Sequence, residues 1–195
     1  MHRPASMDFR LALLLALTLL GVIGVLFVPP LPQDPDYHRF ADTRGWLGIP
    51  NFWDVVSNLP FLLIGLAGWR ELQTGHLPAC LPECRTAWRS FFIGIALIGC
   101  GSAYYHWNPT NASLVWDRVP MAVSFMAVFA AIVSENISAA AGRRLLMPLV
   151  LIGVLSVVYW GWSETVGLGD LRFYALVQFL PMLLLPLILL LYRSP

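Results

Sequence analysis

The sequence predicts an all-α protein, a polytopic bundle of helices that cross a membrane. Of its 195 residues, 58% are hydrophobic and only 12% are charged, whereas soluble domains carry about 25% charged residues. Six apolar runs approach or reach the length of about 20 residues that a helix needs to cross the hydrocarbon core. The connections between these runs are short and polar, so we expect residues 1–195 to form one transmembrane domain.

The predicted helices follow one another along the chain. The first follows Arg3 and Arg10, as a secretory signal would, but it is long and leads into Pro29, Pro30 and Pro32 rather than a small-residue cleavage site. We therefore expect it to be retained. The other five runs each keep an uncharged centre, as the hydrocarbon core requires. The six predicted helices span about residues 11–28, 54–70, 89–107, 117–134, 145–163 and 172–192.

The basic residues predict the orientation of the bundle, because cytoplasmic loops are enriched in Lys and Arg. One side would carry Arg3, Arg10, Arg70, Arg85, Arg89, Arg143, Arg144 and Arg193, and the other only Arg39, Arg44, Arg118 and Arg172. This uneven distribution places both termini in the cytoplasm. The net charge of +1 argues against a nucleic-acid partner.

Polar residues within the apolar runs indicate where function lies, because polar and ionisable groups at membrane depth are costly. At the start of the second predicted helix, Asp54, Ser57 and Asn58 have the i, i+3, i+4 spacing of one helix face. They could form a polar stripe near the outer end. Alternatively, they could cap the helix and tie it to its neighbours by hydrogen bonds.

A second group of polar residues joins the third and fourth predicted helices. Ser102 and His106 are spaced i, i+4 and share a helix face near the outer end. Asp117 follows after a connection short enough to keep it at the same membrane face. Arg118 could instead neutralise Asp117 in a simple interfacial ion pair.

These three residues fit two kinds of chemistry. In nucleophilic catalysis, the histidine would take the proton of Ser102 and the acid would orient the histidine. In metal catalysis, His106 would bind zinc, Asp117 would accept a proton from water, and Ser102 would steady the water or an oxyanion. Catalytic zinc needs about three protein ligands, and the other histidines are in the tail or loops: His2, His38 and His76.

The connection after the fifth predicted helix carries three further charges. Glu164, Asp170 and Arg172 fall on the outer side by the distribution of basic residues. Charged loop residues are mostly exposed, so we interpret these three as solvated.

Three segments of the chain resemble the alkaline ceramidase family, particularly its bacterial branch. They are NFWDVVSNLPFLLIG, GCGSAYYHWNP with WDRVPM, and GDLRFYALVQFLPM. The family belongs to a superfamily of seven-helix transmembrane hydrolases that includes adiponectin-type receptors. The resemblance implies a zinc amidase in which Ser102 is the motif serine, His106 the first zinc histidine and Asp117 the catalytic acid. It also implies a bacterial plasma membrane location.

The chain departs from the family pattern in two places. The family's other zinc ligands form a His-x3-His pair on a seventh helix, and this sequence ends at Pro195 after six. We expect either truncation before the last helix or a variant with a different metal site. Eukaryotic members also bind calcium near the first loop, where this chain keeps Asp42 and Asn51 but has few acids; this argues against calcium.

The sequence thus predicts a membrane-embedded, zinc-dependent lipid amide hydrolase. Its substrate would be ceramide or a related N-acyl lipid, cleaved to a free fatty acid and a long-chain amine. The alternative is a non-catalytic lipid-binding receptor or transporter-like bundle, in which the polar stripes line a ligand cavity.

Overall fold

A computed structural model describes residues 8–74 and 82–192, and this part of the chain is helical with no β-strand. Six of its helical segments are long and apolar enough to cross a membrane, which confirms the predicted fold class. The helices are α1 (Phe9–Phe27), α2 (Phe52–Val56), α3 (Leu59–Thr74), α4 (Arg85–Trp107), α5 (Asn111–Asn136), α6 (Ala139–Thr165) and α7 (Arg172–Leu191). Two 3-10 turns, η1 (Pro35–His38) and η2 (Pro82–Cys84), lie in the connections.

Two helices begin six residues earlier than predicted. The predicted helix 117–134 starts at Asn111, because Thr110 and Ser113 form a reciprocal capping box. The predicted helix 145–163 starts at Ala139, where the Ser138 side chain accepts from the amide of Ala141. Uncharged runs therefore mark the centres of these helices, whereas capping side chains set their ends.

The second predicted helix is broken. Its first turn and a half is α2, and α3 continues after an interruption at Ser57 and Asn58. The Ser57 hydroxyl and the Asn58 amide both donate to the carbonyl oxygen of Asp54, at 3.0 and 2.7 Å. Such local side-chain bonds compete with the helical hydrogen bonds of the backbone. Ser57 and Asn58 thus both bond the backbone of Asp54 at this interruption, as the capping alternative expected.

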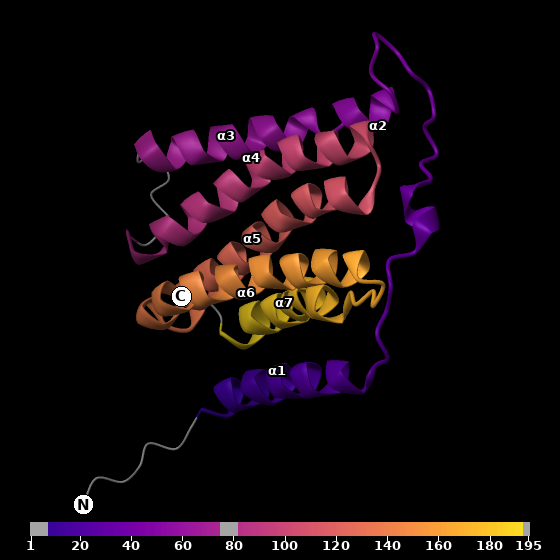
Figure 1. Cartoon of the computed structure of the whole chain (residues 1–195). Coiled ribbons are helices and arrows are strands. Elements are labelled where there is room, and N and C mark those ends of the chain that lie inside the picture. The colour runs from indigo at the N-terminus through magenta and orange to yellow at the C-terminus, as the bar shows by residue number, and fades with distance from the viewer. Residues whose placement is uncertain (1–7, 75–81, 193–195) are drawn as a thin grey trace, which may run out of the picture.

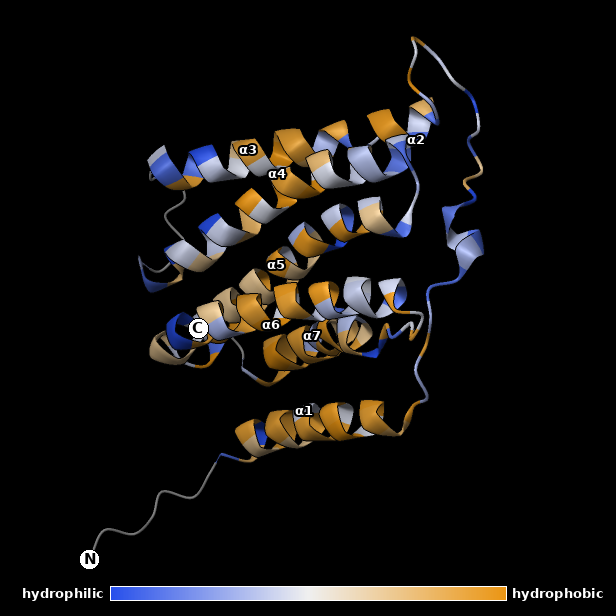
Figure 2. Cartoon of the chain, viewed as in Figure 1, coloured by the Kyte–Doolittle hydropathy of each residue, from blue (hydrophilic) through white to orange (hydrophobic). Residues whose placement is uncertain are grey.

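The bundle is built around α5 (Figure 1). Half of the apolar window of α5 is buried, compared with 6% for α1. α4 and α6 flank α5, α3 covers the far side of α4, and α7 packs against α5, α6 and α1. Figure 2 shows that the apolar residues follow the helices, while the polar ones gather at helix ends and in the long first connection.

Residues 28–51, here called the strap, connect α1 to α2 across one end of the bundle. Figure 1 shows this segment running from α1 at one edge to α2 and α3 at the other, past the ends of the helices between them. Two hydrogen bonds attach the first residues of the strap to the bundle. The Leu171 amide donates to Leu31 O at 2.9 Å, and the Gln33 amide donates to Glu164 Oε1 at 2.8 Å. We call this side of the molecule the strap end. α1 begins and α7 ends at the opposite side.

Candidate active site

A cavity of about 410 Å³ lies between α3, α4 and α5 at the strap end and extends along the helices. Three of the predicted site residues line it: Asn58, Ser102 and Asp117. The remaining lining residues are Tyr37, Phe61, Phe91, Ile95, Ile98, Met121, Ser124, Phe125 and Val128. The cavity is thus an apolar space with a small group of polar side chains.

Ser102 and Asp117 lie near one another between α4 and α5. Both residues are buried, each being 8% exposed, and the Ser102 hydroxyl is close enough to the Asp117 carboxyl group to act on it. Ser102 on α4 and Asp117 on α5 thus border the same cavity. Asn58, 6% exposed, adds a third polar side chain from the start of α3.

The close approach of α4 and α5 depends on a glycine and a proline. Pro120 has no amide hydrogen, so the carbonyl of Trp116, four residues before it, loses its usual helical partner. That carbonyl lies against Gly101, where a Cβ atom would be only 2.1 Å from the oxygen. Gly101 thus makes room for the turn of α5 that carries Asp117, directly beside Ser102.

The apolar part of the cavity follows one face of each helix away from this polar end. Ile98, Ile95 and Phe91 precede Ser102 by four, seven and eleven residues on α4. Eleven residues of helix correspond to about 16 Å at a rise of 1.5 Å per residue. On the antiparallel α5, Val128 lies eleven residues after Asp117 and reaches the same depth. The cavity is therefore elongated, with its polar groups at the strap end.

His106 lies one helical turn beyond Ser102, towards the strap. Its ring packs on Phe40 with centroids 4.5 Å apart, and the Asn51 amide donates to its backbone oxygen at 2.8 Å. Asp54 is close enough to act on the ring electrostatically. The Nδ1 atom is buried and has no hydrogen-bond partner among the residues that the structure describes. A ring nitrogen in this state is free to bind a ligand.

The other histidines do not complete a metal site in the described residues. His38 is engaged through both ring nitrogens, with Tyr105 at 3.0 Å and Asn111 at 2.9 Å. His2 and His76 lie outside the described residues. Within residues 8–74 and 82–192, no three His, Cys, Asp or Glu side chains come together as a metal-binding group. Of the histidines that the structure describes, His106 is thus the one with a ring nitrogen left for a metal.

Comparison with protein families places this geometry in context. The profile of a family described as Ceramidase matches residues 48–189, which include α2 to α6 and nearly all of α7. The chain belongs to the Ceramidase family. No curated protein and no solved structure gives a significant match.

Family membership makes this chain a ceramidase-like hydrolase with a lipid substrate. Its six apolar helices make it a multi-pass membrane protein. The matched region contains Ser102, His106, Asp117 and the whole apolar part of the cavity, but it omits most of the strap. The ceramidase-like core of the chain is therefore the part that builds the cavity.

Arg118 does not serve mainly as an ion-pair partner of Asp117. Its guanidinium is buried among aromatic rings, 4.1 Å from the centroid of Trp160 and 4.8 Å from that of Tyr174. It also lies 5.6 Å from the centroid of Tyr37 and donates to Gln33 Oε1 at 2.7 Å. Arg118 thereby joins the strap to α6 and α7.

The prediction that the α6–α7 connection carries solvated charges was wrong. Asp170 is 3% exposed and forms two bonds of 2.8 Å with the Arg172 guanidinium, which hold the pKa of this carboxyl at about 2. Arg172 also donates to Val28 O at 2.7 Å. Glu164 accepts from the strap at Gln33 and from the Trp160 indole. These charges anchor the strap rather than face water.

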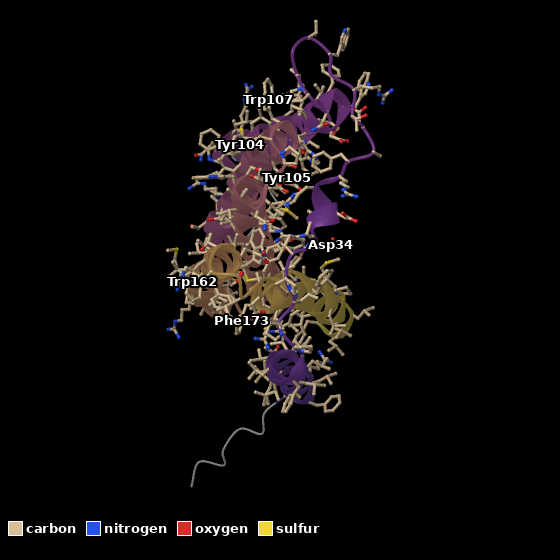
Figure 3. All side chains as sticks on the ribbon, turned by 45° about the vertical axis from the view of Figure 1, so that its right-hand side comes forward. Asp34, Tyr104, Tyr105, Trp107, Trp162 and Phe173 are labelled. Carbon is tan, nitrogen blue, oxygen red and sulfur yellow. The ribbon has the colours of Figure 1, made fainter. Side chains whose placement is uncertain are left out.

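Sequence reasoning also missed the contribution of the strap to the cavity. Tyr37 lines the cavity and stacks on Tyr105, with ring centroids 6.4 Å apart. Figure 3 shows the strap, labelled at Asp34, passing the helix ends that carry Tyr105 and Phe173. The available signal was length, because connections longer than about 12–15 residues are commonly functional.

Proposed function

We propose that this protein is a zinc-dependent lipid amide hydrolase that cleaves the N-acyl bond of ceramide or a related N-acyl lipid. The products would be a free fatty acid and a long-chain amine. The observation that carries the proposal is that Ser102 and Asp117 are both buried at the polar end of an elongated apolar cavity, in a chain of the Ceramidase family.

The cavity suits a lipid with one polar linkage and a long hydrocarbon chain. Ligand sites are typically apolar with a few placed polar groups that orient the ligand. The amide would lie at Ser102, Asp117 and Asn58, and an acyl chain would extend past Ile98 and Ile95 towards Phe91. A depth of about 16 Å accommodates a hydrocarbon chain of about a dozen carbons.

Each polar side chain has a role in this reaction. His106 would hold the metal through its unpartnered ring nitrogen, and bound zinc supplies the Lewis acidity that lowers the pKa of a water to about 7. Asp117 accepts the proton of the attacking water and returns it to the nitrogen as the C–N bond breaks. Ser102 donates to the Asp117 carboxylate and keeps it directed at the amide.

The sidedness of the bundle follows from the distribution of arginines. With both termini cytoplasmic, as the positive-inside rule favours, the strap end and the polar end of the cavity lie at the outer face. For a bacterial protein, this would be the outer face of the plasma membrane.

The proposal is tested with the protein as its gene encodes it, purified in detergent. Hydrolysis of a fluorescent N-acyl sphingosine should be abolished by a zinc chelator and restored by zinc. Asp117→Asn and His106→Ala should lower kcat/KM at least about 10²-fold, the range for loss of a general base or of metal activation. His106→Ala should also lower the zinc content measured by mass spectrometry.

A matched control is Asp36→Asn, which removes an exposed strap carboxylate paired with the exposed Arg39. This variant should retain full activity. Full activity in both Asp117→Asn and His106→Ala would refute the assignment. Stoichiometric lipid binding by a zinc-loaded protein that shows no turnover would favour a lipid receptor or transporter instead.

A further inference from the structure

The first connection is where the family resemblance implies calcium, and the side chains present there do not fit it. Calcium takes about six to eight oxygen ligands, several of them carboxylates. The Asp42 carboxylate is already engaged, with Oδ1 2.6 Å from Arg44 Nε and Oδ2 accepting from the Trp53 amide at 3.0 Å. The Asn51 side chain is directed at the backbone oxygen of His106.

The Asp42–Arg44 pair closes the turn that ends the strap. The Asp42 side chain is 8% exposed although the Arg44 side chain is 74% exposed, so the carboxylate is the buried partner. Besides the bonds of Asp42, the Phe52 amide donates to Arg44 O at 3.0 Å. The Arg44 guanidinium, together with the backbone amides of Trp53 and Arg44, holds the pKa of Asp42 below its usual range.

This turn is connected to the end of α4 that carries His106. Asn51 adopts a left-handed conformation with φ of 47°, and its side chain bonds the His106 carbonyl at 2.8 Å. On the other side of the turn, Phe40 packs on the His106 ring. The order of the turn and the position of His106 are therefore physically linked.

We propose that the Arg44 guanidinium takes the place of a divalent cation in this protein, so that residues 42–53 fold without calcium. A cation beside Asp42 is needed because a carboxylate that is buried without a positive partner is strongly destabilising. Arg44 supplies that charge from within the chain. Its planar group also holds its donors in a fixed geometry, whereas a lysine ammonium is a compact point charge on a flexible stem.

Thermal unfolding of the full chain in detergent tests the proposal. Addition of CaCl2 after EGTA treatment should shift the Tm of the parent protein by less than about 1 °C. A ligand stabilises a protein only when it binds the native state, and we expect no calcium to bind here. Arg44→Ala should lower the Tm, and millimolar guanidinium should restore part of the loss, whereas equal urea or NaCl should not.

Arg39→Ala is the matched control, because Arg39 is similarly exposed and is paired with the exposed Asp36. It should leave the Tm unchanged and give no response to guanidinium. Hydrogen exchange adds a local readout: in Arg44→Ala, the amides of residues 42–56 should exchange faster, while those of α6 should not.

A saturable rise of the parent Tm with calcium would overturn the proposal. So would equal Tm and exchange in Arg44→Ala and Arg39→Ala. Stabilisation of Arg44→Ala alone by calcium would support it, since the ion would then occupy the position that the guanidinium left.

Discussion

Gly101→Ala should disrupt the site without removing any polar group from it. The added Cβ would lie 2.1 Å from the carbonyl oxygen of Trp116, and Cβ atoms are essentially never closer than 3.0 Å to another heavy atom. The contact is with backbone, so α4 and α5 must separate locally by about 0.9 Å. Displacements of about 1 Å cost on the order of 10²-fold in rate, and overpacking costs roughly 1–3 kcal/mol in stability.

The assay is hydrolysis of an N-acyl lipid, expressed as kcat/KM per folded molecule, together with thermal unfolding. Gly65→Ala is the matched comparison, because its Cβ would lie 2.3 Å from the backbone nitrogen of Ala96 between α3 and α4, away from Asp117. It should lose stability but retain more activity than Gly101→Ala. Gly24→Ala, which meets nothing within 4 Å, should leave activity unchanged and should not lower stability, since alanine favours the helix over glycine. If Gly101→Ala matched Gly24→Ala in both measurements, the reasoning would be refuted.

Three further predictions concern the depth of the cavity and the anchoring of the strap. Phe91→Ala should deepen the cavity and move the optimum of kcat/KM towards longer acyl chains, measured across a series of N-acyl lipids; an unchanged optimum would contradict the proposed path of the chain. Because Arg172 holds the pKa of Asp170 at about 2, below the ordinary 3.8, the native state binds fewer protons than the unfolded state in this interval. Its stabilisation should be complete above about pH 4 and disappear as the pH falls to about 2, and Asp170→Asn should remove this part of the acid dependence of the Tm. Arg118→Lys keeps the charge but loses stacking on the aromatic rings, so it should cost about 1–2 kcal/mol and speed exchange in residues 33–40; parent-like exchange would count against Arg118 as a strap anchor.

The polar pair of the cavity was accessible from the sequence because helical periodicity is local. A spacing of four residues places Ser102 and His106 on one face, and a short connection returns Asp117 to the same membrane face. In the structure, Ser102 and Asp117 line the same cavity. The structure does not place His106 in the cavity lining, because the ring packs on Phe40 of the strap. No spacing rule could reveal that contact, since the two residues are distant in sequence.

The charges at the strap end were misinterpreted for a related reason. A charged residue in a polar connection is usually solvated. The sequence did not show that Tyr159 and Arg172 would both donate hydrogen bonds to the Asp170 carboxylate and bury it. From the sequence, Arg118 was likewise a candidate ion-pair partner of the neighbouring Asp117. Its actual neighbours, Trp160 and Tyr174, come from two other helices.

The sequence by itself determined the fold class, the membrane-crossing segments and the residue types available for chemistry, because hydropathy and helical periodicity are properties of short stretches of chain. Only the tertiary structure decided which of these residues meet. The close approach at Gly101 brings Ser102 to Asp117, and the strap brings Tyr37 to the cavity and buries the charges that anchor it. The strap contacts join segments far apart in sequence, so they depend on how the strap and the helices pack together.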